Sequence, residues 1–206
     1  MIGNWENLAL TMGTSWASGL NLYATLLILG YLHHAGSIVL PPNLEIVAHP
    51  LMMLIAGIMY VVEFFADKIP GVDTLWDTLH TFVRIPAGAV LAVGAVGDDG
   101  LLMQFAAGLV GGGLAGSTHA TKAGTRVLLN TSPEPFTNWT ASVSEDAMVI
   151  GGLWTALHHP MIFLGLLGTF LFVLIWILPR LWQALRRIFS TLGRWFGLTK
   201  SSPSSS

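Results

Sequence analysis

Two carboxylates stand where a membrane helix is expected. Glu63 and Asp67 follow the apolar run of residues 51–62 and lie four residues apart, on one face of a helix. Like charges at that spacing repel each other, and a charge inside a membrane helix costs roughly 2.5–3.5 kcal/mol. A proton, a cation or a basic partner must offset this cost. Glu63, deep in its helix, is therefore the strongest candidate for an ion-binding or proton-binding group.

A second polar group follows the turn KIPGVD. On one helix, Asp73, Asp77, His80 and Arg84 fall within about 60° of one another. The two carboxylates and the imidazole are ligand types for a divalent cation, which could activate water or a phosphate ester. Asp73 could instead be a helix N-cap, since it directly follows the Pro70–Gly71 break.

A basic face complements these acids. In GLVGGGLAGSTHATKAGTR, the residues His119, Lys122 and Arg126 continue the side of the helix on which glycines recur every four residues. The face formed by Gly108, Gly112 and Gly116 is of the small-xxx-small type, which lets two helices pack closely within one chain or between two protomers of a homo-oligomer.

Further polar candidates flank these helices. After the basic face comes NTSPEPFTNWTASVSED, in which the prolines argue against continuous helix, with Asn130 and Glu134 as candidate site residues. This stretch is either a plain loop or a re-entrant segment lining a cavity. Ser142 and Glu145 would then form a capping box at the start of the next helix. Asn21, in the first apolar segment, either bonds to a neighbouring helix or contributes to the site.

The composition indicates a membrane protein. The 206 residues are 53% hydrophobic and 10% charged, with a formal net charge of −2 and no cysteine. Thiol catalysis and cysteine-bound zinc are excluded, and the near-neutral charge argues against a nucleic-acid partner. No motif for an organic cofactor is present; the bound species expected are a proton, a sodium ion or a divalent cation.

The elements that must position these residues are helices. We expect an all-α, polytopic transmembrane bundle over residues 1–178 with about six membrane segments, some of them broken or re-entrant. Six apolar segments are expected at 8–32, 50–66, 74–97, 101–129, 142–158 and 161–178. Residues 179–197 predict a basic amphipathic helix on the membrane surface, which places the C-terminus in the cytoplasm by the positive-inside rule. Residues 198–206 read as a disordered tail.

The chain also shows a weak internal similarity. The segments AHPLMMLIAGIMYVVEFF and HHPMIFLGLLGTFLFVLI both place His-Pro before an apolar run. Either residues 1–99 and 100–178 are inverted repeats, as in many secondary transporters, or His-Pro is simply a good helix start.

Three motifs together, EFFADKIPGVDTLWD, HATKAGTR and NTSPEPFTN, resemble an uncharacterised family of small bacterial multi-pass membrane proteins known only as a domain of unknown function. The resemblance covers roughly residues 17–160. It implies a protein of the bacterial inner membrane and supplies no activity.

Three classes of function remain. The favoured one is a transporter or channel-like carrier of a small ion, anion or lipid-linked solute, coupled to a proton or another cation. The second is a membrane-embedded, metal-dependent enzyme acting on a phosphate or lipid substrate. The third is a structural or accessory protein in which acidic and basic faces only pair with each other.

Overall fold

The structure is a computed structural model that describes residues 4–131 and 135–195, with only some side chains from 181 onward. Within these ranges it holds seven helices and no strand, so the predicted all-α class is confirmed. The helices are α1 (Asn4–His34), the short 3-10 helix η1 (Pro42–Ala48), α2 (Pro50–Ala66), α3 (Val72–Val96), α4 (Leu101–Leu129), α5 (Pro135–His158) and α6 (Pro160–Trp195).

Polarity is arranged as expected for a bundle in lipid. In the described residues, three helices are long and apolar enough to cross a membrane, in α3, α4 and Pro160–Arg180 of α6. The pair η1 and α2, bent by 59°, would make a fourth. The outward face of α2 exposes Leu54, Ile58 and Phe65, while Glu63 on the same helix is 0% exposed. Apolar side chains outside and charged ones inside are compatible with a membrane-embedded protein.

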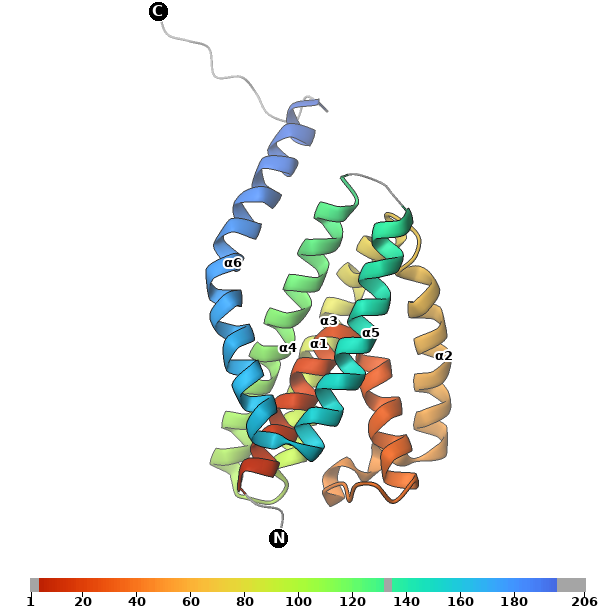
Figure 1. Cartoon of the computed structure of the whole chain (residues 1–206), viewed down its shortest axis with the longest axis vertical. Coiled ribbons are helices and arrows are strands. Elements are labelled where there is room, and N and C mark those ends of the chain that lie inside the picture. Colours follow the sequence, from red (N-terminus) through yellow and green to blue (C-terminus); the bar gives the residue numbers. More distant parts are fainter. Residues whose placement is uncertain (1–3, 132–134, 196–206) are drawn as a thin grey trace, which may run out of the picture.

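Helix α1 is a hairpin of two helices, and this differs from the predicted span over residues 8–32. Asn21 has non-helical backbone angles, φ −147° and ψ 100°. In Figure 1 the first half (red) rises into the middle of the bundle and the second half (orange) runs back to the same end. Asn7 accordingly lines one cavity together with Leu40 and Pro41, which follow the helix. A straight helix of this length would hold its ends about 45 Å apart.

The other helices surround this hairpin. Helix α1 packs against η1 and against each of α2 to α6. Helices α2 to α6 alternate in direction, so that the α2–α3 connection and the facing ends of α4 and α5 lie at the end of the bundle opposite the open end of the hairpin (Figure 1). Because most of α1 is covered by these helices, it can carry buried Ser, Thr and Asn residues that a lipid-facing span would avoid.

Helix α5 begins seven residues before the predicted start at Ser142. Its first residue is Pro135, a position that suits proline because the missing N–H would be unpaired there in any case. Ser142 and Glu145 therefore lie inside a helix, and the predicted capping box is wrong. The prediction of irregular backbone immediately before Ser142 is also wrong, since residues 135–141 are helical. Glu134 lies outside the described residues.

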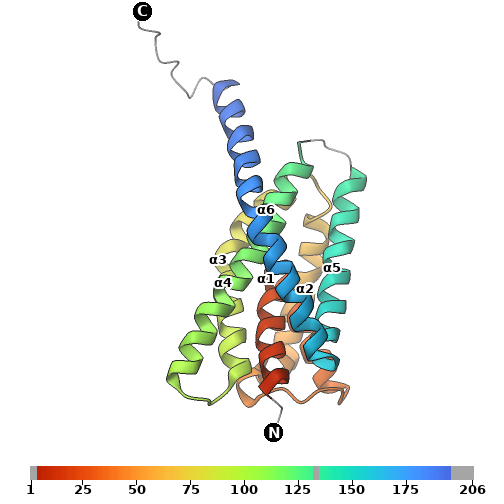
Figure 2. The same cartoon turned by 60° about the vertical axis from the view of Figure 1, so that its left-hand side comes forward.

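Helix α6 runs without interruption through Pro179 to Trp195, where the sequence predicted a span followed by a separate basic helix. Its C-terminal part extends beyond the other helices (Figure 2). The guanidinium of Arg180 stacks on the ring of Trp176 at 3.6 Å. The location of this part on the membrane surface stays a prediction, and the tail over residues 198–206 lies outside the described residues.

Both His-Pro pairs precede helices: His49 caps α2, and Pro160 is the first residue of α6. Both helices begin at the same end of the bundle and run in the same direction (Figure 1), whereas helices related by an inverted repeat run in opposite directions. The similarity thus joins helices that an inverted repeat would not make equivalent, and proline at a helix start accounts for it. The inverted repeat stays a prediction.

The glycine face of α4 packs against α3 of the same chain. A Cβ added at Gly108, Gly112 or Gly116 would meet, in turn, side-chain atoms of Val93, Ala89 and Ile85, which are four residues apart on α3. A homo-oligomer through this face would require α3 to move away.

A different glycine of α4, Gly111, approaches both α1 and α3 closely. A Cβ at Gly111 would lie 2.8 Å from Ser15 Oγ and 2.9 Å from the Gly88 carbonyl oxygen, and would also collide with Ala92 Cβ. We expect Gly111→Ala to destabilise the protein by about 1–3 kcal/mol, because backbone on both sides would have to shift. The check is the thermal unfolding midpoint in detergent.

Gly113→Ala is the matched control, since nothing lies within 4 Å of a Cβ at that position of the same helix. It should be neutral or stabilising, as alanine is favoured over glycine in helices by about 1 kcal/mol. Equal midpoints for the two variants would contradict the close packing at Gly111.

Candidate functional site

Seven ionisable side chains from four helices meet inside the bundle, and we call them the ionic cluster. Each is at most 9% exposed. The members are Glu63 of α2 and its C-cap residue Asp67, Asp77 and Arg84 of α3, Lys122 and Arg126 of α4, and Glu145 of α5.

Lys122 lies at the centre of the cluster. Its Nζ is 2.9 Å from Asp67 Oδ2, 3.2 Å from Glu145 Oε2, 3.3 Å from Glu63 Oε1 and 3.7 Å from Asp77 Oδ1. One ammonium group thus lies within 4 Å of all four carboxylates. Removing its charge would leave these acids close together with two cations instead of three.

The two arginines lie at opposite ends of the cluster. Arg84 pairs with Glu63 through Nη2, and its Nη1 is 3.6 Å from Asp77 Oδ1. Arg126 Nη2 is 2.8 Å from Glu145 Oε2 and 3.5 Å from Asp67 Oδ2. Arg126 Nη1 also donates to the main-chain carbonyls of Asp67 and Asn138, at 3.0 and 3.1 Å. Arg126 therefore joins α4 to both α2 and α5.

The tip of the α1 hairpin rests on the cluster. The break at Asn21 leaves the last carbonyls of the first half-helix without helical partners. Arg84 Nη1 donates to the carbonyl oxygens of Gly19 and Leu20, at 3.2 and 2.9 Å, and Lys122 Nζ donates to that of Leu20 at 3.1 Å. Cations at a helix C-terminus also interact favourably with the helix dipole.

Asn21 starts the second half-helix. Its Oδ1 accepts from the Ala24 N–H at 3.0 Å, the N-cap geometry, and its extended backbone angles suit that role. Its Nδ2 donates to Asp146 Oδ1 at 3.0 Å, and the Tyr60 hydroxyl donates to Asp146 Oδ2 at 3.0 Å. Asn21 therefore both caps a helix and bonds to α5, so it lies beside the cluster without belonging to it.

His119 supports the cluster as a neutral ring. Its Nδ1 accepts from Arg84 Nη1 at 3.2 Å, so this nitrogen carries no proton in this arrangement. Its Nε2 donates to the Asp77 carbonyl oxygen and to Thr81 Oγ1, both at 2.9 Å. The ring thus positions Arg84 and adds no formal charge.

His80 lies apart from the ion pairs. Its Nδ1 donates to the Trp76 carbonyl oxygen at 2.9 Å, and its Nε2 accepts from the Tyr23 hydroxyl at 3.0 Å. The ring also stacks on Trp76. With both nitrogens engaged, His80 joins α3 to the second half of α1.

Asp73 and Asn130 form a separate connection near the α2–α3 turn. Asp73 Oδ1 accepts from the N–H groups of Gly71 and Thr74, at 2.9 and 2.6 Å, but Gly71 is the N-cap of α3, so the prediction of Asp73 as N-cap is wrong. Asn130 Nδ2 donates to both carboxylate oxygens of Asp73, at 2.8 and 3.0 Å, and its Oδ1 accepts from Asn138 Nδ2 at 2.9 Å. The two residues hold together the ends of α3, α4 and α5.

Helix α5 supplies the residues that sequence reasoning missed. Asn138, Ser142 and Glu145 share one face of a helix, at spacings of four and three. The prediction of irregular backbone before Ser142 leaves Asn138 outside any helix, so this face could not be recognised from the sequence. Lys68, which follows Asp67, is 6% exposed and donates to Ser142 Oγ at 3.3 Å.

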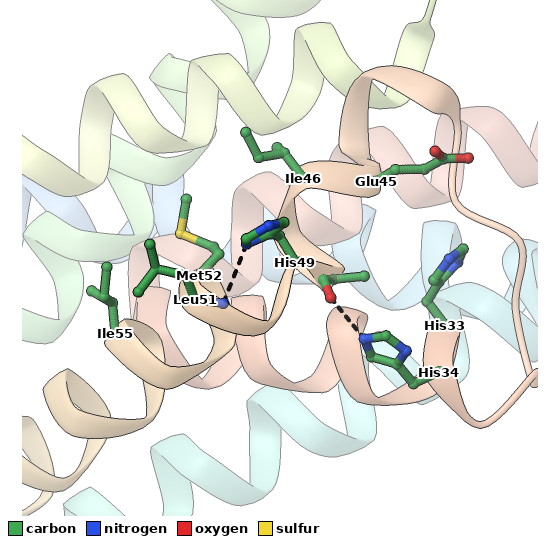
Figure 3. Close-up of a pocket in the computed structure, with 9 residues that line it drawn as sticks. His33, His34, Glu45, Ile46, His49, Leu51, Met52 and Ile55 are labelled. Carbon is green, nitrogen blue, oxygen red and sulfur yellow. Dashed lines mark hydrogen bonds between the residues drawn. The ribbon is translucent and has the colours of Figure 1, made fainter.

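A cavity of about 650 Å³ at the open end of the hairpin is separate from the cluster. Figure 3 shows His33, His34 and His49 around it. His34 Nε2 donates to the Ala48 carbonyl oxygen at 2.7 Å, while His49 Nδ1 accepts from the Leu51 N–H at 3.2 Å and His33 Nδ1 from the Leu40 N–H at 3.5 Å. These imidazoles hold the connection between α1 and α2 in place.

The cluster has the chemistry of a charge-binding site. Four carboxylates and three basic side chains leave one surplus negative charge when all are ionised. Among the described residues, no group of three His, Asp or Glu side chains is placed to hold a metal ion.

Comparison with curated proteins and with solved structures gives no match. One family model does match, over residues 8–180, and it covers the α1 hairpin from residue 8 onward and every residue of the ionic cluster. The chain therefore belongs to the family described as DUF4126, a domain of unknown function.

Proposed function

We propose that this protein is an integral membrane transporter or channel-like carrier of a small ion, anion or lipid-linked solute, coupled to a proton or another cation. One observation carries the proposal: the tip of a re-entrant hairpin meets a buried cluster of seven ionisable side chains. Burying charge in a membrane protein is costly, and such charges usually serve transport or proton relay.

The hairpin supports this reading because broken helices commonly form transporter sites. Half-helix ends at membrane depth present main-chain carbonyls or N–H groups to ions and substrates. Here the carbonyls of Gly19 and Leu20 are occupied by the side chains of Arg84 and Lys122. A substrate anion, or a change in protonation, would compete for the same two cations and so act on the hairpin.

The proposed topology keeps six membrane segments, of which five cross. Helices α2 to α6 span the membrane, and α1 enters and leaves on one side. The arginines after Trp176 favour a cytoplasmic C-terminus, in the inner membrane of a bacterium. The mouth of the hairpin then faces the opposite side. An inverted repeat is not needed for this arrangement.

A structural role is the second candidate, since the eight ion pairs of the cluster connect every acid to at least one base. A metal-dependent enzyme has less support, because Asp73, Asp77 and His80 do not converge: Asp73 bonds to Asn130, and His80 to Tyr23.

Charge movement in proteoliposomes tests the proposal. Purified protein on a solid-supported membrane is exposed to proton, sodium, magnesium and phosphate gradients, and we expect a current under at least one of them. Glu63→Gln should abolish that current, because the buried partner of Arg84 and Lys122 loses its charge.

Glu45→Gln is the control, since Glu45 lies exposed in η1, outside the ionic cluster. Absence of current from monodisperse wild-type protein under all four gradients would contradict electrogenic transport. A Glu63→Arg, Arg84→Glu exchange that keeps both fold and current would favour the structural role for this pair.

A further inference from the structure

Asp77 differs from the other three carboxylates of the ionic cluster. Glu63, Asp67 and Glu145 each accept at least one hydrogen bond from Arg84, Lys122 or Arg126. Neither carboxylate oxygen of Asp77 has a hydrogen-bond partner among the described residues, although the side chain is 0% exposed. A buried carboxylate without such partners is far costlier than a neutral carboxyl group.

The groups that face Asp77 cannot neutralise it fully. From its own helix comes Arg84, and from α4 come Lys122 and His119, whose ring donates to the Asp77 carbonyl. The two cations are closer to other acids: Glu63 for Arg84, and for Lys122 the carboxylates of Asp67 on α2 and Glu145 on α5. From α1 the carbonyl of Leu20 competes for both cations.

The net charge of the ionic cluster also points to Asp77 as the protonated residue. With Asp77 neutral, Glu63, Asp67 and Glu145 balance Arg84, Lys122 and Arg126, three against three. Asp146 and Lys68 lie beside the cluster and add one charge of each sign, which leaves the balance unchanged. A metal ion is disfavoured at Asp77 because two cations lie within 3.7 Å of Oδ1, whereas a proton removes the charge covalently.

We propose, on the basis of the transport function above, that Asp77 is the proton-carrying residue, and that loss of its proton draws Arg84 and Lys122 away from the tip of the α1 hairpin. The same atom, Arg84 Nη1, donates to Gly19 and Leu20 and lies 3.6 Å from Asp77 Oδ1. An ionised Asp77 would be a stronger acceptor for this donor than a main-chain carbonyl. The proton thus controls how firmly the hairpin is held.

Infrared difference spectroscopy and proton flux test this, using Asp77→Asn and the control Asp98→Asn, an exposed residue of the α3–α4 turn. Wild-type protein and Asp98→Asn should show the carbonyl stretch of a protonated carboxyl group that changes with pH, and Asp77→Asn should lack it. Asp77→Asn should fold with undiminished thermal stability, since asparagine resembles the neutral acid, and should carry no pH-driven proton flux.

A protonated-carboxyl band that persists in Asp77→Asn, or that disappears instead in Glu63→Gln, would overturn the assignment. So would a marked loss of stability in Asp77→Asn, or proton flux that survives in it. A band assigned to Asp77 in a protein that passes no current under any gradient would support the proton site and contradict the proposed transport function.

Discussion

Replacing Lys122 by methionine is expected to lower the free energy of unfolding by about 3–5 kcal/mol, the usual effect of removing one partner of a buried ion pair. Lys122 lies within 3.7 Å of a carboxylate oxygen from each of Glu63, Asp67, Asp77 and Glu145, and it is 4% exposed. Methionine keeps the apolar stem and most of the length of lysine. The decrease in unfolding free energy therefore reports the lost charge rather than lost packing. The measurement is unfolding in mixed micelles with increasing denaturing detergent.

The control is Arg180→Met, an exposed base in α6, which should change the free energy of unfolding by less than about 0.5 kcal/mol. Adding Asp67→Asn to Lys122→Met should recover part of the loss, because it removes the acid closest to the missing ammonium. If Lys122→Met unfolds at the same detergent concentration as wild type, Lys122 is not the shared partner of these acids.

The sequence predicted which helices carry charge, because the relevant signals are local. Helical spacing placed Asp77 and Arg84 on one face, and Lys122 and Arg126 on another, and the structure brings these faces together. The bounds of α2, α3 and α4 agree with the predicted segments to within two residues at each end. Pro70 and Gly71 separate α2 from α3, and Gly100 precedes α4, so the bounds of these helices could be predicted from the sequence.

The hairpin in α1 could not be predicted in the same way. The apolar run continues through residues 22–32. Among the residues next to Asn21, only Gly19 is a Gly or Pro that could signal a break. The turn depends on tertiary partners: Arg84 and Lys122 for the carbonyls before it, and Asp146 for the Asn21 amide. Local propensity does not contain that information, since both halves alone are ordinary helix formers.

Glu145 belongs to the ionic cluster but was not predicted as a site residue, for a different reason. The sequence predicts Glu145 at a helix start because Pro133 and Pro135 argue against helix before it. Proline forbids helix interior but suits the first turn, and α5 begins on Pro135. With the helix starting there, Asn138, Ser142 and Glu145 fall on one polar face, and that face points to Arg126 and Lys68.

Replacing Arg84 by glutamine is expected to release the tip of the hairpin without unfolding the bundle. Arg84 donates to the carbonyls of Gly19 and Leu20 and pairs with Glu63, and it is 0% exposed. Because the chain has no cysteine, a single Leu22→Cys substitution next to the tip reports its opening through the rate of thiol labelling. Leu22 is 4% exposed, so labelling requires the tip to open.

If loss of Arg84 weakens the tip by about 3 kcal/mol, its open population and the labelling rate should rise roughly 100-fold. A cysteine at Leu153, which is 0% exposed in α5, reports global unfolding and should label far more slowly than Leu22→Cys in the Arg84→Gln background, because the tip opens without the rest of the bundle. Equal labelling rates at the two positions would mean that the tip opens only when the whole bundle unfolds, and no acceleration at Leu22→Cys would mean that Arg84 does not hold the tip. Faster labelling at the tip than at Leu153 would identify Arg84 as the residue through which the charge state of the cluster acts on the α1 hairpin.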